Sequence, residues 1–135
     1  MLNSSGYFEN PYFSEDELRC KGNGGLNLAP GFLGMLVNFR KVWDEPLTVT
    51  SACRSLEHNI AVGGHVSSLH LTYNLDRSIV GTMAVDISTA GWDDDNVSEF
   101  LTVAQAHGFS TGLAKTFIHL DARILLGRSR ADFTY

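Results

Sequence analysis

The chain has 135 residues, of which 44% are hydrophobic and 19% charged, and its formal net charge is −5. This length predicts one domain over residues 1–135, long enough to bury a core without disulfides. The hydrophobicity is too high for a disordered chain, and a net negative charge without a basic stripe argues against a nucleic-acid partner. No apolar stretch reaches the ~20 residues of a membrane span, and the first residues lack the basic and apolar regions of a signal peptide.

The first structural signals along the chain are helical. Ser14 and Glu17 have the spacing of a capping box, which predicts a short helix that the glycine-rich residues 22–25 end. Apolar residues at helical spacing after Pro30 predict a second helix over residues 30–43. The two cysteines, Cys20 and Cys53, form no CxxC pair, and we expect both to be free thiols.

After the second helix the apolar period changes to two, which predicts a strand over residues 47–54. A short helix over 55–62 and a polar loop over 65–81 follow. The same alternation predicts strands over 83–88 and 117–123, and the segment between them predicts a helix over 94–106. Together these elements predict an α+β domain, with a small, mainly antiparallel sheet that helices cover on one face.

Polar side chains gather on the other face of this predicted sheet. They come from all three strands and from the loop before the second one: Arg54, Ser68, His70, Asp86, His119 and Asp121. Two imidazoles and one carboxylate (His70, Asp86, His119) are a ligand set typical of catalytic zinc, which lowers the pKa of a bound water from 15.7 to roughly 7. The spacing alone fits unrelated core or surface residues better.

Several short segments add to this pattern, and they occur in a fixed order. They are FSEDEL at 13–18, LTVTSACRS at 47–55, HNIAVGG at 58–64, SLH at 68–70, AVDI at 84–87 and FIHLDAR at 117–123. In this order they resemble the D-alanyl-D-alanine carboxypeptidase family of zinc peptidases. That family includes cell-wall carboxypeptidases and phage endolysins and shares its fold with the Hedgehog signalling domain.

The resemblance implies a Hedgehog/DD-peptidase-like fold with one zinc ion held by His70, Asp86 and His119. Arg54 would bind a carboxylate or carbonyl oxygen of the substrate, for which its fork of donors is suited. A salt bridge with Asp86 or Asp121 is the alternative for Arg54. Ser68 would contact substrate, or orient the loop or a ligand by hydrogen bonding, and a plain turn residue is the alternative there.

The chain departs from the family pattern in two places. In the family the first histidine and the aspartate are usually seven residues apart, whereas His70 and Asp86 are 16 apart, which predicts an insertion in the loop 71–80. Residues of that loop either line the groove or form an exposed flap without a role. Some relatives also have a glutamate where this chain has Thr116, and a threonine cannot accept a proton from water at neutral pH. We expect Asp121 to be the general base, unless it only pairs with Arg123.

The resemblance implies a zinc-dependent peptidase that hydrolyses an amide bond in peptidoglycan stem peptides, as a D,D-carboxypeptidase or an endolysin-type endopeptidase. We expect a monomer, either a phage lysis protein released from the host cytoplasm to the cell wall or a virion component. One alternative is a catalytically inactive, zinc-stabilised binding module, for example of a phage tail. Another is a metal-free protein in which the three ligands are only a polar core.

Overall fold

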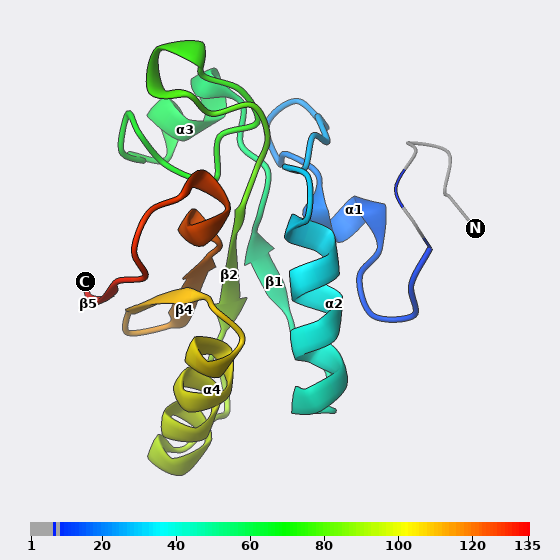
Figure 1. Cartoon of the computed structure of the whole chain (residues 1–135), viewed down its shortest axis with the longest axis vertical. Coiled ribbons are helices and arrows are strands. Elements are labelled where there is room, and N and C mark those ends of the chain that lie inside the picture. The colour runs from blue at the N-terminus through cyan, green and yellow to red at the C-terminus, as the bar shows by residue number, and fades with distance from the viewer. Residues whose placement is uncertain (1–6, 8) are drawn as a thin grey trace.

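The computed structural model describes residue 7 and residues 9–135 and has the α+β architecture expected from the sequence (Figure 1). Its sheet has the strand order β1-β2-β4-β3-β5. The strands are β1 (Val49–Ser51), β2 (Ala84–Ser88), β3 (Ser110–Leu113), β4 (Phe117–Asp121) and β5 (Asp132–Thr134). All neighbouring pairs in this sheet are antiparallel except β3 and β5, which are parallel.

The helices begin where local side chains satisfy their first amide groups. In α1 (Glu15–Leu18), the Ser14 hydroxyl accepts the Glu17 N–H and the Glu17 carboxylate accepts the Ser14 N–H, so the predicted capping box is present. α2 (Phe32–Trp43) starts two residues later than predicted, because Gly31 at φ 87° lies outside the helical region. α3 (Leu56–Ala61) and α4 (Asp94–Ala106) follow, with the 3-10 turns η1 (Leu75–Arg77) and η2 (Arg123–Leu126).

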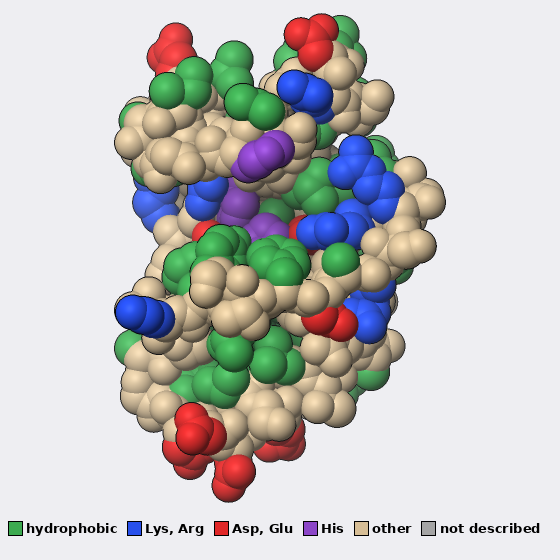
Figure 2. Space-filling model, turned by 90° about the vertical axis from the view of Figure 1, so that its left-hand side faces the viewer, with side chains coloured by type: hydrophobic (Ala, Val, Ile, Leu, Met, Phe, Trp, Pro, Cys, Tyr) green, Lys and Arg blue, Asp and Glu red, His purple; other side chains and the backbone are tan. Residues whose placement is uncertain are grey.

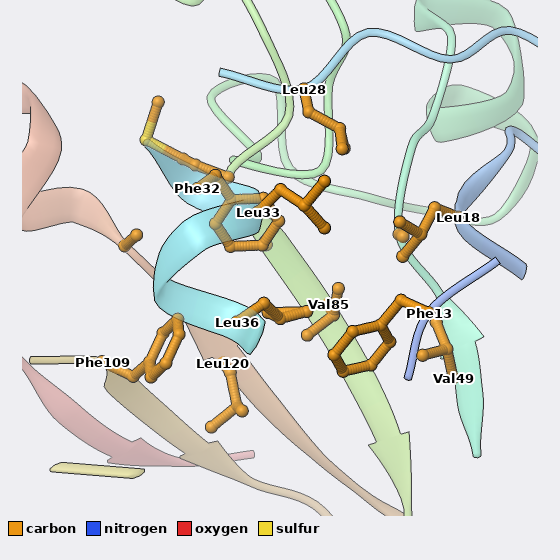
Figure 3. Close-up of a cluster of buried hydrophobic side chains, with 14 of the residues drawn as sticks. Phe13, Leu18, Leu28, Phe32, Leu33, Leu36, Val49, Val85, Phe109 and Leu120 are labelled. Atoms are coloured by element: carbon orange, nitrogen blue, oxygen red, sulfur yellow. The ribbon is translucent and has the colours of Figure 1, made fainter. Parts of the chain in front are cut away.

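The core lies between the sheet and the helices α2 and α4. Figure 3 shows Leu36 of α2 close to Val85 of β2 and Leu120 of β4. Phe39 of α2 packs edge-to-face on Phe100 of α4 with ring centroids 5.2 Å apart. Successive side chains of a strand point in opposite directions. Since Val85 and Leu120 face the helices, Asp86 and His119 point to the other face of the sheet.

None of the helices among the described residues is long and apolar enough to cross a membrane.

The strands differ from the sequence prediction in three places. The first covers only Val49–Ser51 of the expected residues 47–54, and its pairing with β2 has a register irregularity between these two residues. The third ends at Asp121 instead of at residue 123, because η2 begins at Arg123. β3 and β5 were not predicted: β3 contains Gly112 and lacks apolar alternation, and β5 is exposed along its length.

Cys20 and Cys53 are free and buried, as expected.

The loop 71–80, where we expected an insertion, forms a small projecting turn. Asn74 and Ile79 make an isolated bridge around η1, and Ser78 has a positive φ of 59°. Tyr73 and Leu75 on this turn are 58% and 61% exposed. The turn ends at Gly81, whose neighbour Thr82 exchanges backbone hydrogen bonds with the segment 27–29.

Gly81 lies so close to this segment that a side chain has no room. A Cβ atom there would lie 2.6 Å from the backbone nitrogen of Ala29 and 2.7 Å from its Cα. We expect Gly81→Ala to lower the free energy of unfolding by about 1–3 kcal/mol, the usual cost of overpacking, measured by urea denaturation. The control is Gly34→Ala in α2, where a Cβ meets nothing within 4 Å. That change should raise stability by up to about 1 kcal/mol, and equal effects of the two changes would contradict the packing at Gly81.

Candidate metal centre

The sheet register brings two of the candidate ligands together. Asp86 of β2 is the direct antiparallel partner of His119 of β4, and Ala84 is the partner of Asp121. Directly opposed residues share a face, and so do residues two apart on one strand. Asp86, His119 and Asp121 therefore all lie on the face away from α2 and α4.

His70 reaches the same face of the sheet from a loop, which hydrogen bonds to Arg54 and Thr82 hold in place. Its carbonyl oxygen accepts the Arg54 N–H at 2.8 Å and the Thr82 hydroxyl at 2.9 Å. The Ser68 hydroxyl accepts the His70 N–H at 3.2 Å, so Ser68 orients this loop from within the turn. As a result the His70 imidazole is 3% exposed and lies beside the ring of His119, with centroids 5.3 Å apart.

The hydrogen bonds of each imidazole fix which nitrogen carries its proton. His70 Nδ1 lies 2.7 Å from the carbonyl oxygen of Ala52, which can only accept, so Nδ1 is the protonated nitrogen. His119 Nε2 lies 2.8 Å from Asp121 Oδ2, which accepts as an ionised carboxylate. In the neutral rings, the lone pairs are then on His70 Nε2 and His119 Nδ1.

Both lone pairs point at the same carboxylate oxygen. His70 Nε2 and His119 Nδ1 each lie 3.1 Å from Asp86 Oδ1. Three acceptors that face one another repel unless a proton or a cation lies between them. The three ligand atoms lie within 4.8 Å of one another, and a tetrahedral ion with ordinary zinc bond lengths separates its ligands by roughly 3.3 Å. The donor set and its spacing therefore fit a metal ion.

The pKa shifts of these groups follow from the same contacts. Burial lowers the pKa of His70, although Asp86 acts in the opposite direction, so this ring is neutral. Burial also acts to lower the pKa of His119, but the hydrogen bonds with Asp121 and Asp86 outweigh it and raise the pKa. For Asp86, burial acts to raise the pKa, but the contacts with His119 and His70 outweigh it and hold the pKa well below its usual range.

Asp121 is enclosed on both sides. Its Oδ2 accepts from His119 and from Arg123 Nη2 at 2.8 Å, and its Oδ1 accepts from Arg123 Nε at 2.9 Å. Burial acts to raise the pKa of Asp121, but the hydrogen bonds from Arg123 and His119 lower it to about 2. The pairing with Arg123 that we considered from the sequence is thus present, and the same carboxylate also holds His119.

Arg54 lies against the opposite side of Asp86. Its Nη2 is 3.4 Å from Asp86 Oδ2, so the salt bridge considered as its alternative role is present, at long range. Ser51 accepts from Arg54 Nε at 3.0 Å, and Asn59 Oδ1 accepts from Nη1 at 3.3 Å. We did not predict Asn59, which is 1% exposed and also donates to the His65 carbonyl. The only signal for it was its place within the segment HNIAVGG.

A pocket of about 650 Å³ opens above these groups. Figure 2 shows it as a hollow with histidine side chains at its floor and basic side chains on both sides. All six predicted site residues line it: Arg54, Ser68, His70, Asp86, His119 and Asp121. Neither the residues 71–80 nor Thr116 lie among its described lining residues, so the loop 71–80, which we call the flap, lies outside the pocket.

Comparison with known proteins adds a family to this geometry. A family model described as peptidase M15 matches residues 11–121, which contain every candidate ligand. M15 peptidases are zinc enzymes that include D-Ala-D-Ala carboxypeptidases. No individual curated protein matches the chain.

The converging lone pairs predict a metal affinity that depends on each of the three ligands. We expect His70→Ala and His119→Ala each to lower zinc affinity more than about 100-fold, because even outer-shell partners cost 10–100-fold. The measurement is calorimetric titration with zinc, backed by elemental analysis. His65→Ala is the control, since His65 lines the same pocket but is exposed and outside the ligand cluster. Undiminished zinc binding by either ligand variant would refute this site.

Proposed function

The chain belongs to the peptidase M15 family, and we propose that it hydrolyses an amide bond in peptidoglycan stem peptides with one zinc ion. It would do so as a D,D-carboxypeptidase or as an endolysin-type endopeptidase. The observation that carries this proposal is the pair of histidine lone pairs that converge on Asp86 Oδ1 beneath an open pocket. The proposed protein is a monomer that acts at the cell wall, as a phage lysis protein or a virion component.

His70, Asp86 and His119 are the proposed zinc ligands. Zinc held there would supply a Lewis acid that polarises the scissile carbonyl and makes water nucleophilic at neutral pH. The chain's contribution is a fixed ligand geometry: the Ala52 carbonyl orients His70, and Asp121 orients His119. Such partners keep each ring in the tautomer that a metal needs.

Arg54 is the proposed donor to a substrate carboxylate or carbonyl oxygen. Its guanidinium lines the pocket beside Asp86, and Ser51 and Asn59 hold it in a fixed orientation. A pre-oriented cation near the ligands would stabilise negative charge that develops on an oxygen of the substrate. The long distance of 3.4 Å to Asp86 leaves this guanidinium able to bind a closer partner.

The contacts of Asp121 favour a positioning role over the general base that we expected from the sequence. A base must accept a proton, but both oxygens of this buried carboxylate already accept from Arg123 or His119. Its lowered pKa also makes it a poor acceptor near neutral pH. We therefore propose that Asp121 fixes His119, as carboxylates that bind ligating histidines do.

The contacts of the carboxylates in the pocket also support a second candidate function. Asp86 and Asp121 are the only carboxylates among the described residues that line the pocket, and both are engaged. Thr116 stands at the position of the relatives' glutamate and lies outside the pocket. A zinc-stabilised module that binds peptidoglycan peptides without cleaving them would need no base.

Digestion of purified sacculi distinguishes the two functions. The zinc-loaded protein is expected to release peptides with new termini, which mass spectrometry identifies together with the bond cut. A chelator should abolish the release and added zinc restore it, and His119→Ala should release nothing. Sacculi that stay intact while the protein binds them would support the binding module instead.

Replacing Asp121 by asparagine separates the two roles of this residue. We expect Asp121→Asn to lower zinc affinity by about 10–100-fold, because the His119 N–H loses an ionised acceptor. Zinc titration measures this effect directly. Asp76→Asn on the exposed flap is the control and should change nothing. If Asp121→Asn kept its zinc affinity and lost turnover, the general-base role would hold.

A further inference from the structure

The chain beyond the family match builds one wall of the pocket. The match ends at Asp121, and the pocket is also lined by Arg123, Arg128, Phe133 and Tyr135. Residues 128–135, which we call the C-terminal wall, run along the edge of β3. The wall lies outside the matched residues and supplies none of the proposed metal ligands.

Specific hydrogen bonds hold the C-terminal wall in place. β5 pairs in parallel with β3, and the Thr111 hydroxyl donates to Asp132 Oδ1 at 2.8 Å. The Tyr135 N–H donates to the Leu113 carbonyl at 2.9 Å, and the Ala131 N–H donates to the Ser110 hydroxyl at 3.0 Å. These contacts span the whole of β3, so the wall has a defined position beside the site.

Two of the side chains that the wall presents to the pocket, Phe133 and Tyr135, are aromatic. The Phe133 ring lies 5.7 Å from the ring of His119 and 5.6 Å from that of Tyr135, which in turn lies 5.3 Å from Phe117. Gly112 leaves room for this arrangement, since a Cβ there would lie 2.4 Å from the Phe133 ring. The result is an apolar surface directly next to a proposed metal ligand.

Arg128 adds a positive charge beside this surface. Of the three arginines that line the pocket, Arg54 pairs with Asp86 and Arg123 pairs with Asp121. Arg128 is exposed and has no ion-pair partner among the residues that the structure describes. Three arginines against two carboxylates give the pocket an excess of positive charge in a chain whose formal net charge is −5. Such local charge concentrates anionic ligands.

We propose that Arg128 binds a carboxylate of the substrate while Phe133 and Tyr135 pack against the apolar atoms beside that carboxylate. The C-terminal wall would thereby select acidic peptides. This inference rests on the proposed function, because it assumes that the pocket takes a peptide. It adds a specificity determinant that the metal centre does not supply: an exposed guanidinium can form a charge-assisted, bidentate pair with a carboxylate.

Singly amidated peptides test the inference. The probes are three synthetic stem pentapeptides: one with all carboxylates free, one amidated at the D-glutamate carboxyl and one amidated at the C-terminus. For each, the zinc-loaded protein is assayed for Kd by calorimetry where the peptide stays intact and for kcat/KM where it is cleaved. Amidating one of the two positions should weaken recognition by the unaltered protein by about tenfold, the low end for a charged hydrogen bond.

Arg128→Ala should weaken recognition of the free peptide by the same factor and respond no further to that amidation. Arg77→Ala, which removes an exposed arginine of the flap outside the pocket, is the matched control and should keep the full preference. If the preference for the acid persisted in Arg128→Ala, or was absent from the unaltered protein, while cleavage or binding remained, the inference alone would fall. If the unaltered protein neither bound nor cleaved any of the three peptides, the proposed function would fall with it.

Discussion

The site depends on two hydrogen bonds that face away from its centre. The Ala52 carbonyl accepts a hydrogen bond from His70 Nδ1–H, and Asp121 accepts one from His119 Nε2–H. Each bond leaves the other ring nitrogen as an acceptor, and both acceptors face Asp86 Oδ1 at 3.1 Å. In a buried setting such an arrangement is unfavourable without a positive charge at its centre. The hydrogen bonds to Ala52 and Asp121 therefore make the space between the two other ring nitrogens and Asp86 suitable for a cation.

The fold supplies this arrangement through backbone pairing more than through loops. Antiparallel register sets Asp86 opposite His119, and strand alternation adds Asp121 on the same face. The helices α2 and α4 cover the other face, where Val85, Ile87 and Ile118 are buried. His70 is the exception, because it comes from a loop. The Arg54 N–H and the Thr82 hydroxyl both donate to the His70 carbonyl oxygen and hold that loop in place.

The parts of this structure that local patterning controls could be predicted from the sequence. Period-two alternation identified the face shared by Asp86 and His119, and the capping box identified the start of α1. Contacts made by the backbone or by distant residues could not be predicted. No side-chain pattern indicates that the Ala52 carbonyl meets His70, or that Asn59 holds Arg54. β3 and β5 were missed for a related reason: Gly112 interrupts the alternation of β3 because Phe133, 21 residues later, needs the space.

Asp121 connects the metal centre with the part of the chain beyond the family match. On one side its carboxylate holds His119, and on the other it accepts the Arg123 N–H at 3.1 Å and two bonds from the Arg123 guanidinium. Arg123 begins η2, which turns the chain back toward β3 and so sets the direction of the C-terminal wall. One buried carboxylate thus holds both His119 and the start of η2, the turn that leads to the C-terminal wall. A carboxylate with both tasks needs both oxygens and a low pKa. These properties suit Asp121 to the positioning of His119. In an enzyme another group would then transfer the proton, and a binding module would need no such group.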